Sequence, residues 1–194
     1  SAHGSTPYAG LNAIVVLCDA LMLLDHQEDQ VEMIEVIRSL GADTTGGALG
    51  IAGEDDIAGP LTSNLGIADL SDGHLRLTFN IRYPVSWDKD ELRKRLEPTL
   101  ERTGLSIDKI SDQRPLYVPK DDPLTKTLLD VYRAETGDMR EPQTMGGGTY
   151  ARVMAKGLAF GPEFPGSDGT GPHQANESWA TDDLIRATNI YAKA

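Results

Sequence analysis

Features that mark several protein classes are scarce in this sequence. Its 194 residues include a single cysteine, Cys18, so no disulfide bond can form within the chain. Cys18 ends the apolar run Ile14–Cys18, where we interpret it as a small buried hydrophobic residue rather than a reactive thiol. No apolar run approaches the ~20 residues that a membrane-spanning helix requires, and no signal peptide is visible. We therefore expect a cytoplasmic protein with no membrane partner.

Basic residues are also scarce relative to acidic ones. The chain has 18 Lys and Arg against 30 Asp and Glu, which gives a formal net charge of −12. A field of this sign repels nucleic acid and anionic membranes and favours solubility. No basic stripe interrupts it, so we expect no nucleic-acid partner. Hydrophobic residues make up 39% of the chain, which is enough for a folded core.

Helix-type spacing of apolar residues predicts three helices in the first part of the chain. They are expected at residues 5–24, 29–40 and 88–104, and either Ser5 or Thr6 can cap the first. The apolar face predicted for the first helix comprises Leu11, Ile14, Val15, Cys18, Leu21 and Met22.

A β-hairpin is predicted between the second and third helices. Strands are expected at Leu61–Leu70 and His74–Tyr83, joined at Asp72-Gly73, a dipeptide typical of tight turns. In the second strand apolar residues alternate with polar ones, so the period of two places the two sets on opposite faces. The polar set is Arg76, Thr78, Asn80 and Arg82. A further strand is expected within residues 105–118.

This order of elements predicts an α+β layer in which helices cover one face of an antiparallel sheet. A boundary near residues 119–123 divides the chain into expected domains at 1–118 and 119–194. The elements expected in the second domain are a helix at 123–135, a short strand at 158–160 and a closing helix at 182–193, capped by Thr181.

Four positions carry groups that suit ligand binding. His3 precedes a predicted helix start, where an imidazole can donate to an oxyanion. The glycines Gly146–Gly148 let backbone N–H groups approach an anion, although the spacing and the lysine of a P-loop are absent. His173 closes a long loop with polar residues close by, as a metal ligand does, and Arg82 offers a guanidinium that suits a carboxylate. From the residues alone, a surface histidine, a tight loop and a surface salt bridge remain open as interpretations.

Taken together and in this order, these segments resemble the M20 metallopeptidase family, and most closely its PepV-like dipeptidases of the Xaa-His type. The matching stretches are SAHGSTPYAGLNA, LTSNLGI, LTFNIRYP, GGGTYAR, AFGPEFPG and PHQANE. The family has a two-zinc α/β catalytic domain interrupted by a lid with a ferredoxin-like α+β sheet. The resemblance implies that residues 1–118 form the lid and that residues 119–194 are the C-terminal segment of the catalytic domain.

The resemblance also implies roles for individual residues. His3 matches the lid histidine that stabilises the tetrahedral intermediate, and Arg82 matches the lid arginine that binds the substrate's C-terminal carboxylate. Asn64 lies in a lid segment that is close to the substrate in relatives. His173 matches the last zinc ligand. The loop whose backbone holds the same end of the dipeptide matches Gly146, Gly147, Gly148 and Thr149.

The family's other zinc ligands and its general base match nothing in this chain. The acidic pairs Asp55-Asp56 and Asp121-Asp122 lie in loops that the family does not use for metal. We therefore expect a zinc-dependent dipeptidase with two Zn²⁺ ions in the complete protein, and no activity from this chain alone. Three alternatives remain open: an M20-type N-acyl amino acid amidohydrolase or deacylase, a non-catalytic ferredoxin-like binding or dimerisation module, and an anion-binding domain built on the glycine loop. A monomer and a homodimer are both open.

Overall fold

The computed structural model describes residues 6–154, 156–161, 163–166 and 175–194. These residues form two compact units, each of which is described by itself. The first unit runs to Pro115 and includes Thr144–Gly147, and the second comprises Leu116–Gln143 and the residues from Gly148 onward. Within the described residues, no helix is both long enough and apolar enough to span a membrane.

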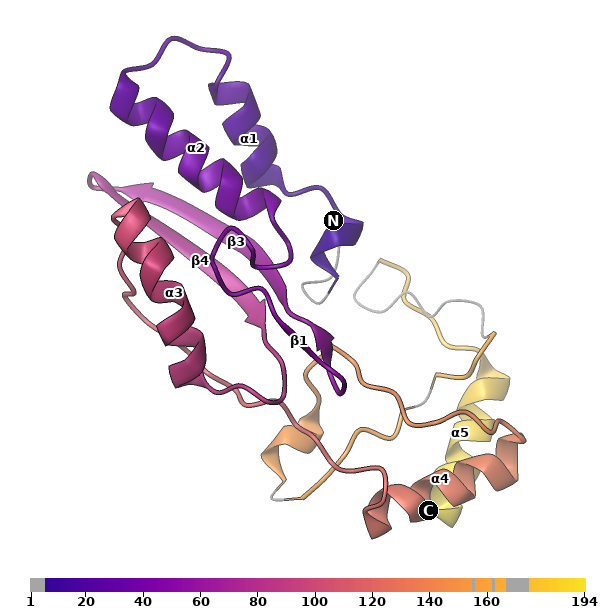
Figure 1. Cartoon of the computed structure of the whole chain (residues 1–194). Helices are drawn as coiled ribbons and strands as arrows, with labels where there is room; N and C mark the ends of the chain where they lie inside the picture. Colours follow the sequence, from indigo (N-terminus) through magenta and orange to yellow (C-terminus); the bar gives the residue numbers. More distant parts are fainter. Residues whose placement is uncertain (1–5, 155, 162, 167–174) are drawn as a thin grey trace. The chain divides into compact units, whose positions relative to one another are not determined.

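The first unit confirms the predicted α+β class (Figure 1). Its sheets are two separate antiparallel pairs, a minimal one of β1 with β2 and a long hairpin of β3 with β4. The elements in chain order are η1 (Pro7–Ala9), α1 (Ala13–Leu21), α2 (Glu28–Ala42), β1 (Glu54–Asp55), β2 (Gly59–Pro60), β3 (Thr62–Ser71), β4 (His74–Arg82) and α3 (Lys89–Thr103).

The β3–β4 hairpin has the turn that the sequence predicts. Asp72 and Gly73 both have positive φ, 52° and 75°, which is the backbone that a two-residue hairpin turn of the I′ type needs. The ladder runs from Ser71 opposite His74 to Thr62 opposite Arg82, with one irregularity in β3 where Gly66 separates Leu65 from Ile67. This irregularity is a β-bulge, because one residue of β3 has no counterpart in β4.

Helices cover the apolar face of the hairpin. One core cluster contains Leu92 and Leu96 of α3, and another contains Ile34 and Ile37 of α2 together with Cys18 of α1. Both clusters contact Leu77 and Phe79 of β4, so the alternation of β4 places its apolar set inward as predicted. Cys18 is only 3% exposed, which confirms its interpretation as a packing residue.

Leu65 of β3 offers a direct test of this core, because it is 1% exposed and belongs to the cluster around Cys18. Replacing Leu65 by alanine removes buried methyl groups and leaves a cavity, so the free energy of unfolding should fall by roughly 2–5 kcal/mol. Leu70 of the same strand is 64% exposed, and Leu70→Ala should change stability by less than about 0.5 kcal/mol. Urea unfolding of both variants measures the difference, and equal losses would contradict the burial of Leu65 and the exposure of Leu70.

The predicted first helix starts too early. Residues 7–9 form a short 3₁₀ turn, Gly10 is extended, and α1 begins only at Ala13. Asn12 is the actual cap, because its Oδ1 accepts from the N–H of Ile14 at 2.9 Å. Leu11, which the prediction placed on the apolar face, therefore precedes the helix and is 79% exposed.

The strand predicted within residues 105–118 is absent, since this described segment has no ladder partner. Its apolar residues Leu105 and Ile107 do pack against the α3 core cluster, which accounts for the strand-like pattern. The segment contacts β4 and the residue after it through side chains instead, with Asp108 near Arg76 (3.4 Å) and Asp112 bonded to Tyr83. An alternation of apolar residues thus indicates that their side chains are packed. A β-strand also requires backbone hydrogen bonds to a neighbouring strand.

The second unit is built around α4 (Pro123–Thr136) and α5 (Thr181–Lys193), with a 3₁₀ turn η2 at Tyr150–Val153. Asp122 caps α4 by accepting from Leu124 N–H at 2.9 Å, and Gly137 ends it with a φ of 70°. The core cluster is Phe164, Ala187 and Ile190, with Val131, Tyr132 and Phe160 packed against it.

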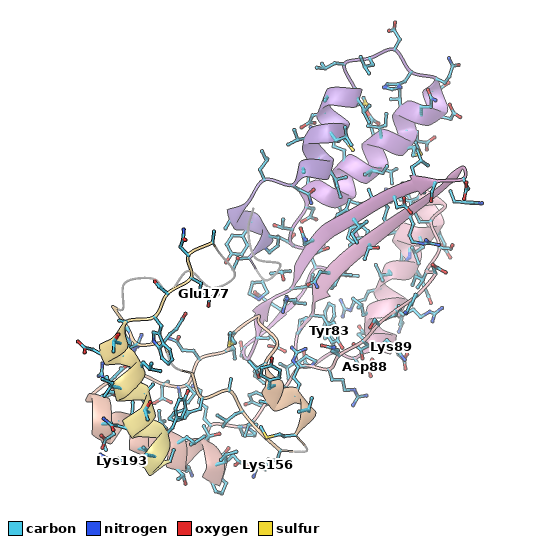
Figure 2. All side chains as sticks on the ribbon, turned by 180° about the vertical axis from the view of Figure 1, so that it is seen from behind. Tyr83, Asp88, Lys89, Lys156, Glu177 and Lys193 are labelled. Atoms are coloured by element: carbon cyan, nitrogen blue, oxygen red, sulfur yellow. The ribbon has the colours of Figure 1, made fainter. Side chains whose placement is uncertain are left out.

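An ion pair also joins the two helices of this unit. The Nζ of Lys193, labelled in Figure 2, lies 2.6 Å from Glu135 Oε1. The strand predicted at residues 158–160 is absent among the described residues. Phe160 packs as an apolar residue of an irregular segment instead, with its ring edge-on to Tyr191.

Candidate functional site

Arg82 is the last residue of β4 and lies on the face of the hairpin opposite the core. The residue before it, Ile81, packs against the α3 cluster, and the period of two therefore turns Arg82 to the other side. Arg82 is half-buried and its Nε is inaccessible to solvent. Its stem is thus held by the protein, which limits the rotamer entropy that a bound carboxylate would cost.

The ladder assembles further polar residues around Arg82. Thr62 lies directly opposite Arg82, and Asn64 lies directly opposite Asn80, one repeat along the same face. The structure therefore brings together two predicted site residues, Asn64 and Arg82, on adjacent strands. We call these four residues, Thr62, Asn64, Asn80 and Arg82, the polar hairpin face.

Thr62 of the polar hairpin face has a buried hydroxyl group without a hydrogen-bond partner among the described residues. The Oγ1 of Thr62 is buried, and within the described part of the chain it has no hydrogen-bond partner. Buried hydroxyl groups in folded proteins are almost always bonded, so such an atom points to a ligand or to water. In the ladder the backbone of Thr62 lies directly opposite that of Arg82.

The residue after Arg82 fixes the end of β4. The hydroxyl of Tyr83 donates to Asp112 Oδ1 at 2.6 Å (Tyr83 is labelled in Figure 2). Burial of the ring, together with the Asp112 carboxylate, raises the pKa of Tyr83 to about 12. Tyr83 therefore stays neutral near pH 7 and acts as a hydrogen-bond donor that anchors the strand end. Pro84, which is fully buried, then ends the strand.

Asn12 links the start of the chain to the same hairpin, a function that the sequence analysis missed. Its Nδ2 donates to the backbone carbonyl of Leu65 at 2.8 Å while its Oδ1 caps α1. The 3₁₀ turn η1 contacts β3 as well. An Asn directly before an apolar helical run is a recognisable capping signal, but nothing in the sequence predicts its second bond to β3.

The glycine loop is a bend at Gly146 and Gly147, and Thr149 after it has extended backbone. A Cβ added at Gly148 would lie 3.6 Å from Arg152 Cζ, so the Arg152 guanidinium packs over this glycine. The segment after the loop forms a 3₁₀ turn of four residues, which is too short to present the dipole of an α-helix. Thr149 precedes this turn without a side-chain capping bond. The loop's proposed contact with substrate stays a prediction.

The two histidines singled out by the sequence, His3 and His173, lie outside the described residues. His26 has a structural contact, because its Nε2 lies 2.7 Å from the carbonyl oxygen of Leu21. His74 is exposed beside the hairpin turn. Across the described ranges, no three His, Cys, Asp or Glu residues come together as a metal site would require.

The acidic pairs have local structural uses. Asp55 accepts from the N–H groups of Ile57, Ala58 and Ser86 at 2.6–3.0 Å, and the bond from Ala58 is the main cause that lowers the pKa of its carboxyl. Asp122 caps α4 and bonds to Lys156, labelled in Figure 2, which lowers the pKa of this carboxyl. The carboxylates of Asp55 and Asp122 are thus engaged in bonds within the chain.

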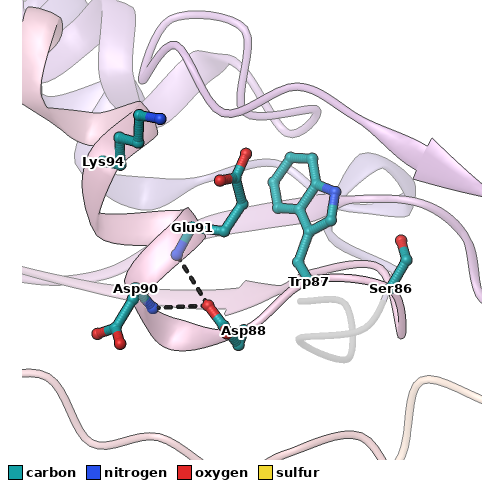
Figure 3. Close-up of a pocket in the computed structure, with 6 residues that line it drawn as sticks. All are labelled: Ser86, Trp87, Asp88, Asp90, Glu91 and Lys94. Atoms are coloured by element: carbon teal, nitrogen blue, oxygen red, sulfur yellow. Dashed lines mark hydrogen bonds between the residues drawn. The ribbon is translucent and has the colours of Figure 1, made fainter.

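A shallow hollow of about 630 Å³ lies at the N-terminus of α3 (Figure 3). Asp88 accepts there from the N–H groups of Asp90 and Glu91, as the dashed lines in Figure 3 mark, and so uses its oxygen to cap the helix. The acidic lining would repel a substrate carboxylate, so we do not place the substrate there. The residues that line it are Ser86, Trp87, Asp88, Asp90, Glu91 and Lys94.

Comparison with known proteins now places the chain in a family. The model of peptidase family M20/M25/M40 matches residues 9–194, which is nearly the whole chain. The chain therefore belongs to this family, and the resemblance drawn from its motifs is confirmed.

Individual relatives agree with this assignment. The chain is 37% identical over 196 residues to "Putative dipeptidase YtjP" of Bacillus subtilis (strain 168), which covers all of this chain and 42% of that protein. A Staphylococcus epidermidis protein of similar name is 37% identical over 194 residues, and one from Staphylococcus aureus (strain USA300) is 34% identical over 194. Both matches cover 99% of this chain and 41% of the relative. The chain thus spans about two fifths of the length of the curated relatives it matches.

Proposed function

We propose that this chain is part of a zinc-dependent dipeptidase and that its first unit is the lid that binds the substrate's C-terminal carboxylate. The observation that carries the proposal is the polar hairpin face, on which Asn64 and Arg82 share one side of adjacent strands. Family membership and the names of the relatives support a peptidase of the dipeptidase kind. The chain matches only 42% of the length of the Bacillus subtilis relative, which supports a proposal of activity for the complete protein and not for this chain alone.

Arg82 is the residue that binds the carboxylate in this proposal. A guanidinium presents parallel N–H donors that match the two oxygens of a carboxylate, and its half-buried setting strengthens that bond relative to one in bulk water. Asn64 adds a neutral donor from the neighbouring strand, and the buried hydroxyl of Thr62 is available to the same ligand. Because a dipeptide has its carboxylate one residue beyond the cleaved bond, binding at a fixed point selects substrates of that length.

The remaining residues are assigned roles by the family resemblance. His3 would donate to the oxyanion that develops at the scissile carbonyl, a contact typically worth about 3–4 kcal/mol. The backbone of Gly146–Thr149 would bind the same end of the dipeptide as Arg82. His173 would be a zinc ligand.

The metal belongs to the complete protein in this proposal. A zinc site needs three or four donors, and the described residues bring no such group together, while the sequence offers only His173 for this role. The donors of this chain therefore do not by themselves fit a two-zinc site.

A hybrid enzyme tests the proposed function. In this hybrid, the 194 residues of this chain replace the matching segment of the Bacillus subtilis relative. We expect the hybrid to hydrolyse free dipeptides and the isolated chain to hydrolyse none. Dipeptides and N-acyl amino acids both carry the carboxylate that Arg82 would bind, so binding of this group does not separate the two M20-type activities. A panel that contains both substrate classes does separate them. A folded hybrid that cleaves only N-acyl amino acids, or neither class, would contradict the dipeptidase proposal.

Asn64→Ala in the hybrid should raise KM for a dipeptide about fivefold to tenfold, with little change in kcat. The physical reason is the loss of one hydrogen bond, worth roughly 1 kcal/mol, made equally in the ground state and the transition state. Asn189→Ala, on the exposed side of α5, is the matched control and should leave both constants unchanged. Steady-state kinetics check this, and an unchanged KM for Asn64→Ala would remove Asn64 from the site.

A further inference from the structure

Helix α1 has apolar residues on its outer side as well as on its core side. Ile14, Cys18 and Leu21 belong to the core cluster shared with α2 and the hairpin. The outer residues are exposed, and the larger ones strongly so: Leu17 is 57% exposed and Leu24 is 62% exposed. We call these outer residues, Ala13, Val16, Leu17, Ala20, Leu23 and Leu24, the outer α1 face.

The spacing of the outer α1 face is that of a helix-packing surface. Ala13, Leu17, Ala20 and Leu24 follow one another at intervals of four, three and four residues, which is the spacing of residues that line one side of a helix. Leu24 lies in the turn that follows the helix, where its N–H bonds to Leu21 O at 2.9 Å.

No charge interrupts this surface. Asp19 is the only charged residue between positions 13 and 24, and it pairs with Arg38 of α2. A helix that is apolar on every side is normally buried on every side, and contiguous exposed apolar patches mark interaction sites. The outer α1 face therefore has the properties of a surface that binds another protein segment.

We propose that the outer α1 face docks against the part of the polypeptide that the relatives possess and this chain does not include. The relatives match this chain over 41–42% of their length, so more than half of their length is available to supply the covering surface. A segment in the same polypeptide has a high effective concentration, so docking does not have to offset the loss of translational and rotational freedom that separate molecules incur.

A second copy of this chain is the weaker candidate for the occupant. Each copy has a formal net charge of −12, so two copies repel each other at long range. The outer α1 face contains no basic side chain that would offset this repulsion.

Hydrogen exchange on the isolated chain and on the hybrid enzyme tests the proposal. Because hydrogen exchange does not depend on catalysis, this inference and the proposed function can fail separately. We expect amide exchange in residues 13–24 to be at least tenfold slower in the hybrid than in the isolated chain, with no such change at the hairpin turn around Asp72. Equal exchange of residues 13–24 in the two proteins would overturn the proposal.

Paired substitutions provide a second readout. Leu17→Glu with Leu24→Glu should lower the Tm of the hybrid by several degrees and leave that of the isolated chain nearly unchanged, since the face is exposed there. Leu70→Glu, at a residue that is 64% exposed near the hairpin turn, should lower neither. Equal effects of the pair on both proteins would overturn the proposal. So would light scattering that shows a dimer of the isolated chain which the pair dissociates.

Discussion

Arg82→Ala in the hybrid enzyme is expected to lower kcat/KM for a free dipeptide by about 100-fold, mainly through a higher KM. Truncation leaves a substrate carboxylate without its charged partner, a loss of about 2.7 kcal/mol when converted at 1.36 kcal/mol for each factor of ten. The half-buried setting of Arg82 favours a loss of this size, because solvent does not fully replace the lost donor. Steady-state kinetics on the purified variant measure it.

Two controls isolate the carboxylate contact. A dipeptide amide lacks the charge that Arg82 would bind, so its already low kcat/KM should change by less than about threefold in Arg82→Ala. Arg82→Lys keeps the charge and loses the planar fork, and it should fall between wild type and alanine. If Arg82→Ala weakened hydrolysis of the free dipeptide and its amide equally, Arg82 would have a structural role and not the one proposed.

His3→Ala is expected to lower kcat of the hybrid by roughly 100-fold to 1,000-fold with little change in KM. This is the typical effect of removing one donor to a developing oxyanion, because the donor acts on charge that appears only in the transition state. The kcat and KM of purified His3→Ala, compared with those of wild type, check the prediction.

His74 supplies a matched control for His3. It is an exposed histidine beside the hairpin turn, and His74→Ala should leave both kinetic constants unchanged. A His3→Ala variant that kept its kcat and lost affinity would contradict the assigned role and point to ground-state binding instead.

The hairpin shows how much of the site the sequence could predict. Asp72-Gly73 predicts the turn, the turn sets the register, and the alternation in β4 then places Arg82 and Asn80 away from the core. The pairing of Asn64 with Asn80 follows less directly, because the bulge at Gly66 shifts the register of β3 by one residue. A bulge has no reliable signal in a single sequence.

Other features depend on contacts between distant residues and could not be predicted. The bond from Asn12 to Leu65 crosses 53 positions of sequence, and the bond from Tyr83 to Asp112 crosses 29. The missing strand at residues 105–118 has the same origin, since apolar spacing reports burial and does not reveal whether a neighbouring backbone is available to pair.

The exposed side of α1 was missed for a different reason. The sequence predicts which residues of the helix are apolar and correctly assigns Cys18 to the core side. Apolar residues on the remaining side, such as Leu17, belong to no core cluster of the described residues. Their exposure is visible only in the structure.

A crystal structure of the hybrid with a non-hydrolysable dipeptide analogue tests the central claim most directly. The claim predicts that the C-terminal carboxylate of the analogue lies within hydrogen-bond distance of the Arg82 guanidinium, beside Asn64 and Thr62 on the polar hairpin face. A carboxylate bound elsewhere, with Arg82 making the same contacts in the free and bound enzyme, would contradict it.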